Sequence, residues 1–242
     1  MSSNPNDALI VALDFPTVDE AWAMVEKLGP ACQFYKIGLE LLFHGGQRLA
    51  QKLKAQGKRV FIDAKLLDIA TTVEKATRNI AKLEADFLTV HVTDRQTLEA
   101  AVRGRGDSSL RLLGVTVMTS LSEHDLAEQG IANFQVQDLV SRRAELAEQS
   151  GLDGVVASGL EASTIRANVG SDFLIVTPGI RSLGADAQDQ NRVMTPSRAI
   201  AAGAQHLVVG RPICQADDPR DAAEAINAEI AQALAPASTD NL

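Results

Sequence analysis

The sequence alternates eight short apolar runs with amphipathic stretches, and this alternation restricts the fold more than any other feature. Each run is continuously apolar, which is typical of parallel strands covered on both faces. The predicted strands are Ala8–Asp14, Cys32–Gly38, Arg59–Lys65, Asp86–Val92, Leu110–Thr119, Asp153–Ser158, Asp172–Pro178 and Gln205–Gly210. The predicted helices between and after them include Val18–Leu28, Arg48–Gln56, Val73–Leu83, Gln96–Arg103, Val136–Gln149 and Ala222–Leu234.

A strand followed by a helix, repeated along 242 residues, predicts a TIM (β/α)8 barrel. The length indicates a single domain over residues 1–242, with flexible ends at about 1–7 and 236–242. A doubly wound open sheet is the alternative, but no GxGxxG fingerprint follows the first strand. The polar segment Gly179–Arg192 follows the seventh strand, so it is predicted to be a long loop at the catalytic face.

The net charge of −8 argues against a nucleic-acid partner or an anionic membrane, because both require a basic face. A small phosphorylated ligand needs only a local anion site and stays compatible with this charge. The two cysteines and four histidines fit no metal-ligand spacing, so no metal site is expected. The N-terminus lacks a signal-peptide pattern and no apolar stretch reaches about 18 residues, so a cytoplasmic location without a membrane span is expected.

Charged residues lie at the ends of the first three apolar runs, on the side of the barrel that carries active sites. The strongest pattern is Asp63-Ala64-Lys65-Leu66-Leu67-Asp68, or DxKxxD. Residues two apart on a strand point the same way, so Asp63 and Lys65 should both face the barrel interior. Asp14 and Lys36 end the first two strands, which would complete an alternating array of four charges. Either a functional site or a set of structural ion pairs would explain the array.

Four further positions have two interpretations each. Asp68 lies where the next helix should begin, so it is either a functional carboxylate or a helix N-cap. His91 ends the fourth predicted strand and is either a site residue or a buried core histidine. Thr119 and Ser120 end the fifth, where their hydroxyl groups would contact a ligand or cap the following helix.

The last two predicted strands point to a phosphate site. The eighth run ends in Gly210-Arg211, and the seventh is followed by Gly179-Ile180-Arg181. Glycine lets a backbone approach a ligand closely, and arginine binds phosphate through two parallel hydrogen bonds. TIM barrels often bind phosphate in the loops after strands seven and eight. The alternative is a pair of surface turns with solvated arginines.

Six motifs resemble the orotidine 5'-phosphate decarboxylase family, and the match runs in order from about Ala8 to Ile213. They are ALDFP, FYKIG, DAKLLDI followed by Thr72, VMTS, PGIR with the later Gln190, and VVGRPI. DxKxxD alone is shared by a wider superfamily, but its combination with KIG, PGIR and Gln190 is specific. The sequence departs from many bacterial members at Leu67, where they have histidine, and at Ala70, where they have proline.

The resemblance implies a cofactor-free, metal-free decarboxylation of orotidine 5'-phosphate to uridine 5'-phosphate in pyrimidine biosynthesis. It implies that Lys65 donates a proton to ring carbon six and that Asp63 lies beside the departing carboxylate and holds Lys65. It further implies a homodimer in which Asp68 and Thr72 complete the partner subunit's site.

The resemblance also assigns the remaining substrate contacts. Asp14 and Lys36 would contact the ribose hydroxyl groups. Thr119 and Gln190 would lie near the pyrimidine or bridge it to the phosphate. The phosphate and its closing loop would be bound by Arg181, Gly210 and Arg211.

Two other functions are compatible with parts of the sequence. A 3-keto-L-gulonate 6-phosphate decarboxylase shares DxKxxD but uses magnesium, and Lys36, PGIR and Gln190 favour the pyrimidine enzyme over it. A non-catalytic protein that binds a phosphorylated ligand is the second. The charged array argues against it, because binding alone does not require Lys65 between two aspartates.

Overall fold

Eight parallel strands close into a barrel in the computed structural model, which describes residues 5–131, 135–181 and 194–235. Each strand pairs with its neighbour in the sequence, and β8 pairs with β1 through partners such as Ile10 and Val208. The strands are β1 Leu9–Ala12, β2 Phe34–Ile37, β3 Arg59–Leu66, β4 Phe87–His91, β5 Arg111–Val115, β6 Gly154–Val156, β7 Leu174–Thr177 and β8 His206–Val209. The predicted single-domain TIM barrel is confirmed.

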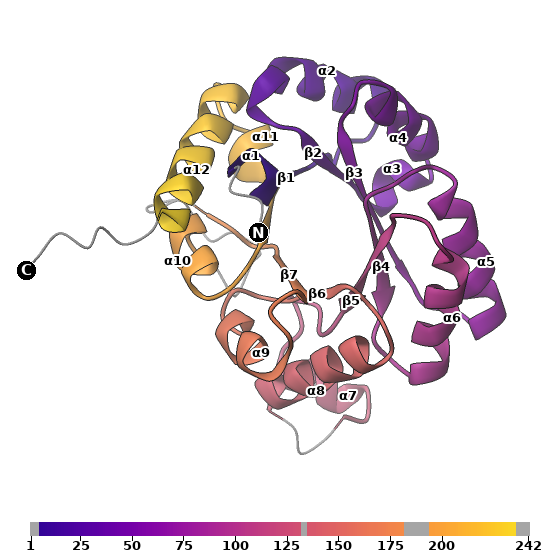
Figure 1. The fold of residues 1–242 in the computed structure, drawn as a ribbon. Helices are drawn as coiled ribbons and strands as arrows, with labels where there is room; N and C mark the ends of the chain where they lie inside the picture. The colour runs from indigo at the N-terminus through magenta and orange to yellow at the C-terminus, as the bar shows by residue number, and fades with distance from the viewer. Residues whose placement is uncertain (1–4, 132–134, 182–193, 236–242) are drawn as a thin grey trace, which may run out of the picture.

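Helices surround the barrel as an outer ring (Figure 1). Its members are α2 Val18–Leu28, α4 Gly46–Ala55, α5 Ala70–Ala81, α6 Arg95–Arg105, α8 Val136–Gln149, α9 Ala162–Asn168, α10 Pro196–Ala201 and α12 Pro219–Leu234. Shorter elements are α1 Pro5–Ala8, η1 Gly29–Ala31, α3 Leu39–Leu42, α7 Glu123–Glu128 and α11 Arg211–Cys214. Helix α1 thus begins within the end predicted to be flexible, and residues 1–4 and 236–242 lie outside the described residues. In the described ranges, no helix is both long and apolar enough to cross a membrane.

Helix starts follow from local capping groups. Helix α2 begins at Val18 because the Thr17 hydroxyl accepts a hydrogen bond from the Glu20 amide at 3.2 Å. Helix α7 begins after Ser122, which forms a reciprocal capping box with Asp125. The N-cap of α5 is Ile69, which has no capping side chain. The N-cap alternative for Asp68 is therefore wrong by one residue.

The barrel has an inner and an outer apolar layer. Ile10 and Ala12 belong to the cluster that fills the barrel, whereas Leu9 and Val11 pack in the larger cluster beneath the helices. This division follows from the two-residue period of a strand, which sends alternate side chains to opposite faces. The inner cluster also contains Phe34, Phe61, Phe87, Leu113, Val176 and Val208.

An aromatic cluster closes the barrel at the amino ends of the strands. Phe34, Phe87 and His206 are the first residues of β2, β4 and β8, and the His206 ring lies edge-on to both phenylalanines. The Arg59 guanidinium lies 4.0 Å from the centre of the Phe34 ring. His206 Nδ1 lies 2.9 Å from the Asp7 carbonyl oxygen. In the described part of the chain, side chains therefore fill this end of the barrel.

The buried imidazole makes stability depend on pH. Burial, with a smaller contribution from the nearby Arg59 charge, lowers the pKa of His206 to about 4. An unfolded chain binds this proton near pH 6.5, so folding stability should fall as the pH drops from about 6.5 towards 4. The expected contribution is a loss of about 2 kcal/mol between pH 7 and pH 5.

Urea unfolding at the two pH values would measure this loss. His206→Phe keeps a ring in the cluster and removes the titrating group, so its stability should depend less on pH by about 2 kcal/mol. An equal dependence in the wild type and the variant would assign the effect to other groups.

Candidate active site

A pocket of about 330 Å³ opens at the carboxyl ends of the strands. Its volume is in the range of small-molecule sites. The polar and glycine residues that line it are Asp14, Lys36, Asp63, Lys65, Thr119, Ser120, Gly179, Arg181, Gly210 and Arg211. Its apolar lining is Ala12, Phe61, Val115, Val117, Met118, Val156, Pro178 and Val208. The pocket thus unites residues from most of the barrel strands and their following loops.

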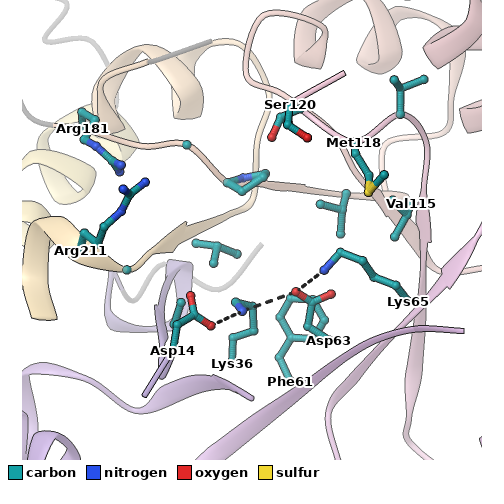
Figure 2. A pocket seen from close by; sticks show the side chains of 18 residues that line it. Asp14, Lys36, Phe61, Asp63, Lys65, Val115, Met118, Ser120, Arg181 and Arg211 are labelled. Carbon is teal, nitrogen blue, oxygen red and sulfur yellow. Dashed lines mark hydrogen bonds and ion pairs between the residues drawn. The ribbon is translucent and has the colours of Figure 1, made fainter. Parts of the chain in front are cut away.

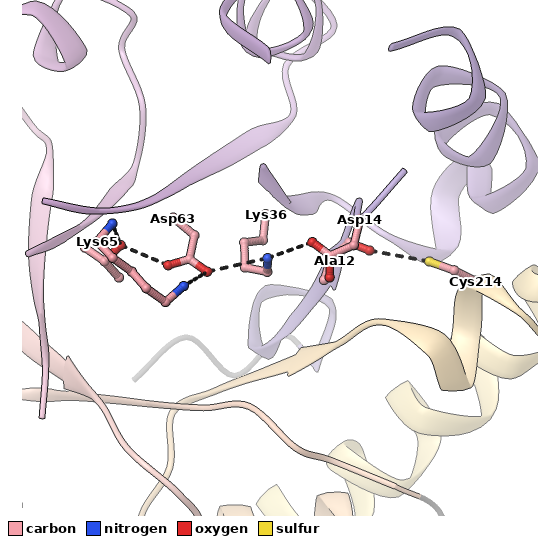
Figure 3. Close-up of polar contacts among 7 residues, drawn as sticks. Ala12, Asp14, Lys36, Asp63, Lys65 and Cys214 are labelled. Carbon is pink, nitrogen blue, oxygen red and sulfur yellow. Dashed lines mark hydrogen bonds and ion pairs between the residues drawn. The ribbon is translucent and has the colours of Figure 1, made fainter. Parts of the chain in front are cut away.

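Four side chains form a continuous chain of ion pairs along one side of the pocket (Figure 3). Lys36 Nζ lies 3.1 Å from Asp14 Oδ1 and 3.5 Å from Asp63 Oδ2. Lys65 Nζ lies 2.8 Å from the same Asp63 oxygen. The predicted alternating array of four charges is therefore present in the structure.

Lys65 reaches this array through an irregular backbone, not through the strand alternation expected from the sequence. Pairing with β4 advances four residues from Ile62 to Leu66 on β3, but only two from Leu88 to Val90 on β4. Lys65 lies in this bulge with φ of +47°, a conformation that is unusual for a residue with a side chain. Such outliers persist where the surrounding structure enforces them, and they cluster at functional sites.

Thr89 holds the bulge and was not recognised from the sequence. Its hydroxyl group donates to Asp63 Oδ1 at 2.9 Å and accepts from the Lys65 amide at 2.9 Å. A single buried side chain thus fixes both the carboxylate and the backbone of the lysine. The available signal was a threonine inside the apolar run of β4, two residues before His91.

The environment of Asp63 keeps its carboxylate ionised. Burial alone would raise the pKa of Asp63, but the charges of Lys36 and Lys65 and the hydrogen bonds from Lys65 and Thr89 hold that pKa below its usual value. A fixed negative charge therefore lies beside the Lys65 ammonium. Since Lys36 is bound to the same carboxylate, Asp63 retains a cation even when Lys65 acts on a ligand.

Two arginines lie across the pocket from Lys65. Figure 2 shows Arg181 and Arg211 at one end and the Asp63–Lys65 pair at the other, with Asp14 and Lys36 between. Arg181 is buried after β7, and Arg211 is the first residue of α11 after β8. Both arginines line the pocket together with Gly210, and they could bind an anionic group remote from Lys65.

Two of the predicted site residues lie outside this pocket. Asp68 and Thr72 are exposed and do not line it, and Asp68 Oδ1 accepts a hydrogen bond from the Ile69 amide at 2.7 Å. Their assignment to a partner subunit's site stays a prediction. Gln190 and most of the loop Gly179–Arg192 lie outside the described residues.

Of the residues with two interpretations, Thr119 and Ser120 line the pocket and His91 does not. Strand β5 ends at Val115, so Thr119 and Ser120 lie in the following loop, where both line the pocket. They do not cap the next helix, because Ser122 does. His91 is half-buried at the end of β4 and is absent from the pocket lining. Burial, followed by the charges of Lys65 and Arg143, lowers the pKa of His91.

Residues 7–226 match the family described as Orotidine 5'-phosphate decarboxylase / HUMPS family. The chain is 56% identical to the orotidine 5'-phosphate decarboxylase of Rhodopseudomonas palustris (strain BisB5), over 94% of this chain and 96% of that protein. It is 55% identical to the enzyme of Bradyrhizobium sp. (strain BTAi1), over 96% of this chain and 94% of that protein. The chain belongs to the orotidine 5'-phosphate decarboxylase family.

Solved structures of the orotidine 5'-phosphate decarboxylase family share the fold. A crystal structure of the enzyme from Lactobacillus acidophilus has a TM-score of 0.82 and 37% identity, over 92% of this chain and 98% of that chain. The enzyme from Pyrococcus horikoshii OT3 gives a TM-score of 0.74 at 26% identity, over 92% of this chain and 98% of that chain. The names of the relatives do not favour the magnesium-dependent alternative.

Within the described ranges, no group of three or more histidine, cysteine, aspartate or glutamate side chains is arranged to hold a metal ion.

The two departures from the decarboxylase pattern, Leu67 and Ala70, lie outside the pocket lining. Leu67 has 59% of its surface exposed, so this substitution places an apolar side chain on the surface next to Asp68.

Proposed function

We propose that this chain is an orotidine 5'-phosphate decarboxylase that releases carbon dioxide and forms uridine 5'-phosphate. The observation that carries the proposal is the placement of two arginines and an Asp63–Lys65 ion pair at opposite ends of one pocket. The arginines are suited to the substrate's phosphate, and the apolar walls at Val115, Val117 and Val156 to a flat ring. This orientation brings the pyrimidine to Lys65.

The chemical difficulty is the negative charge that develops when the carboxylate leaves. The bond from ring carbon six to the carboxylate breaks, carbon dioxide departs, and the electron pair stays on carbon six in the plane of the ring. This pair cannot delocalise into the ring's π system. A preorganised cation beside the developing charge stabilises the transition state strongly, and the Lys65 ammonium is placed for this purpose.

The same ammonium completes the reaction. Lys65 Nζ–H donates its proton to carbon six, which gives the neutral ring of the product. Asp63 keeps the ammonium in place at 2.8 Å. The ionised Asp63 would also lie beside the substrate's carboxylate, and repulsion between two like charges would favour its departure.

Loss of orotate absorbance on mixing the purified protein with orotidine 5'-phosphate tests the proposed reaction. The assay is run with and without EDTA, and the rate should be equal in both. Tight binding of uridine 5'-phosphate without release of carbon dioxide would favour a non-catalytic binding protein. A rate that disappears with EDTA and returns with magnesium would favour the magnesium-dependent alternative.

We further propose that the chain acts as a homodimer in which Asp68 and Thr72 complete the partner's pocket. Support comes from the surface around Asp68, where Leu67 is 59% exposed and Ile69 is 70% exposed. Large apolar side chains grouped on a surface are typical of a protein interface. An isologous interface would carry both copies of Asp68 to the opposite subunits. A cytoplasmic location stays a prediction.

Mixing two inactive variants tests whether Asp68 acts across the interface. Lys65→Ala and Asp68→Ala homodimers should each have little activity. A mixed dimer would have one site with both native residues, so an equal mixture after subunit exchange should recover about a quarter of wild-type activity. If Asp68 acted within its own subunit, every site in the mixture would lack one residue and no activity would return.

A further inference from the structure

Gly38 follows β2, is buried and lies beside the Asp14–Lys36 ion pair. A Cβ atom at this position would lie 3.0 Å from Lys36 Nζ and 3.1 Å from Asp14 Oδ1. Both contacts are shorter than a carbon atom normally makes, so both charged groups would have to shift by a few tenths of an ångström. The space in which Lys36 and Asp14 pair therefore exists because position 38 has no side chain.

The backbone does not explain the glycine. Gly38 has φ of −92° and ψ of −177°, which is extended backbone that alanine adopts without strain. The reason for a glycine at position 38 is therefore the space that it leaves for the Asp14 and Lys36 side chains. This makes Gly38→Ala an unusually clean test, because the added methyl group acts only on its neighbours.

The two neighbours differ in how freely they can move. The Lys36 side chain is 10% exposed and lies between two carboxylates, whereas the Asp14 side chain is 57% exposed. Asp14 should therefore move further than Lys36. On its other side, Asp14 Oδ2 lies near Gly210, at 3.8 Å from the point that a Cβ there would occupy. A shift of Asp14 would thus disturb the pocket near Gly210 and Arg211, on the far side of the array from Lys65.

We propose that Gly38 is a positioning residue that fixes Asp14 and Lys36 in the geometry that holds the substrate between its phosphate and its reacting ring. This inference rests on the proposed function, since it assigns that stretch of the pocket to the middle of the substrate. It places Gly38 in the binding part of the site, because a Cβ atom there would have no atom of the Asp63–Lys65 pair within 4 Å.

Steady-state kinetics with orotidine 5'-phosphate test the inference on Gly38→Ala. KM should rise about tenfold, because displacements of this order at a binding group are costly, while kcat stays within about threefold of the wild type. Gly170→Ala is the matched control. Its Cβ would meet a carboxylate oxygen of Glu148 at 3.2 Å, outside the pocket lining, so its KM should not change. A fall in kcat at unchanged KM, or no kinetic change, would overturn the inference.

A double-mutant cycle shows whether Gly38 acts through Asp14. Asp14→Ala removes one of the two crowding groups and frees Lys36 Nζ from its pair with Asp14, so in this background Lys36 can yield to the added methyl group and Gly38→Ala should raise KM by less than it does in the wild type. If the two substitutions together raised KM by the product of their separate effects, Gly38 would not act through Asp14. The same cycle on the free energy of unfolding needs no substrate. If the wild type released no carbon dioxide, the proposed function would fail. Non-additive changes in the free energy of unfolding would still support the crowding of Asp14 by a side chain at position 38. Additive changes would refute it.

Discussion

Lys65→Ala should lower kcat for orotidine 5'-phosphate by at least about 10⁴-fold. Loss of a positioned proton donor typically costs about 10²–10⁴-fold, and loss of one preorganised electrostatic group costs about 10²–10³-fold. Lys65 is proposed to supply both. Single-turnover measurements of carbon dioxide release would give the remaining rate of the variant.

The variant is expected to fold. Asp63 would keep Lys36 at 3.5 Å and the Thr89 hydroxyl at 2.9 Å, so no buried carboxylate would be left without partners. Alanine also makes the same demand on the backbone at φ of +47° as lysine does, because both have a Cβ atom. Far-UV circular dichroism and urea unfolding would check this expectation.

Lys54→Ala is a matched control for the lysine. Lys54 pairs with Asp86 at 2.9 Å, its side chain is 25% exposed against 32% for Lys65, and Asp86 also pairs with Arg59. The control thus removes an ammonium from a comparable network outside the pocket lining, and its kcat should stay close to that of the wild type. Near-normal kcat in Lys65→Ala would refute the mechanism.

Removal of the phosphate from the substrate should lower turnover as well as affinity. Hydrogen bonds to charged groups contribute about 1.5–3 kcal/mol each, so loss of the contacts with Arg181 and Arg211 should lower kcat/KM by about 10²–10⁴-fold. Part of this loss should be in kcat, because binding energy from a remote group is used to assemble the site. The measurement compares orotidine with orotidine 5'-phosphate.

Arg211→Ala tests whether Arg211 binds the phosphate group of the substrate. The variant should lose about 10–100-fold in kcat/KM with orotidine 5'-phosphate and little with orotidine, since the nucleoside has no phosphate to bind. An equal loss with both substrates would mean that Arg211 supports the pocket in another way. Equal kcat for the nucleotide and the nucleoside in the wild type would contradict the use of phosphate binding in turnover.

Most of the site could be predicted because the relevant residues end apolar runs. Because the strands of a (β/α)8 barrel are parallel, all their carboxyl ends lie on the same side of the barrel. Asp14, Lys36 and Asp63 are therefore expected to lie close together. The same rule placed Arg211 beside the pocket. The rule says nothing of residues inside a strand, and for that reason Thr89 was not identified.

The sequence by itself determined the eight strands, their parallel order and the side of the barrel that carries the charges. These features follow from local periodicity, since continuous apolar runs require burial on both faces. Only the tertiary structure decided how Lys65 reaches Asp63, where the side chain of Asp68 lies, and why position 38 has no side chain. Each depends on distances between residues on different strands or loops, which are set when the barrel closes and the β3 bulge forms against β4.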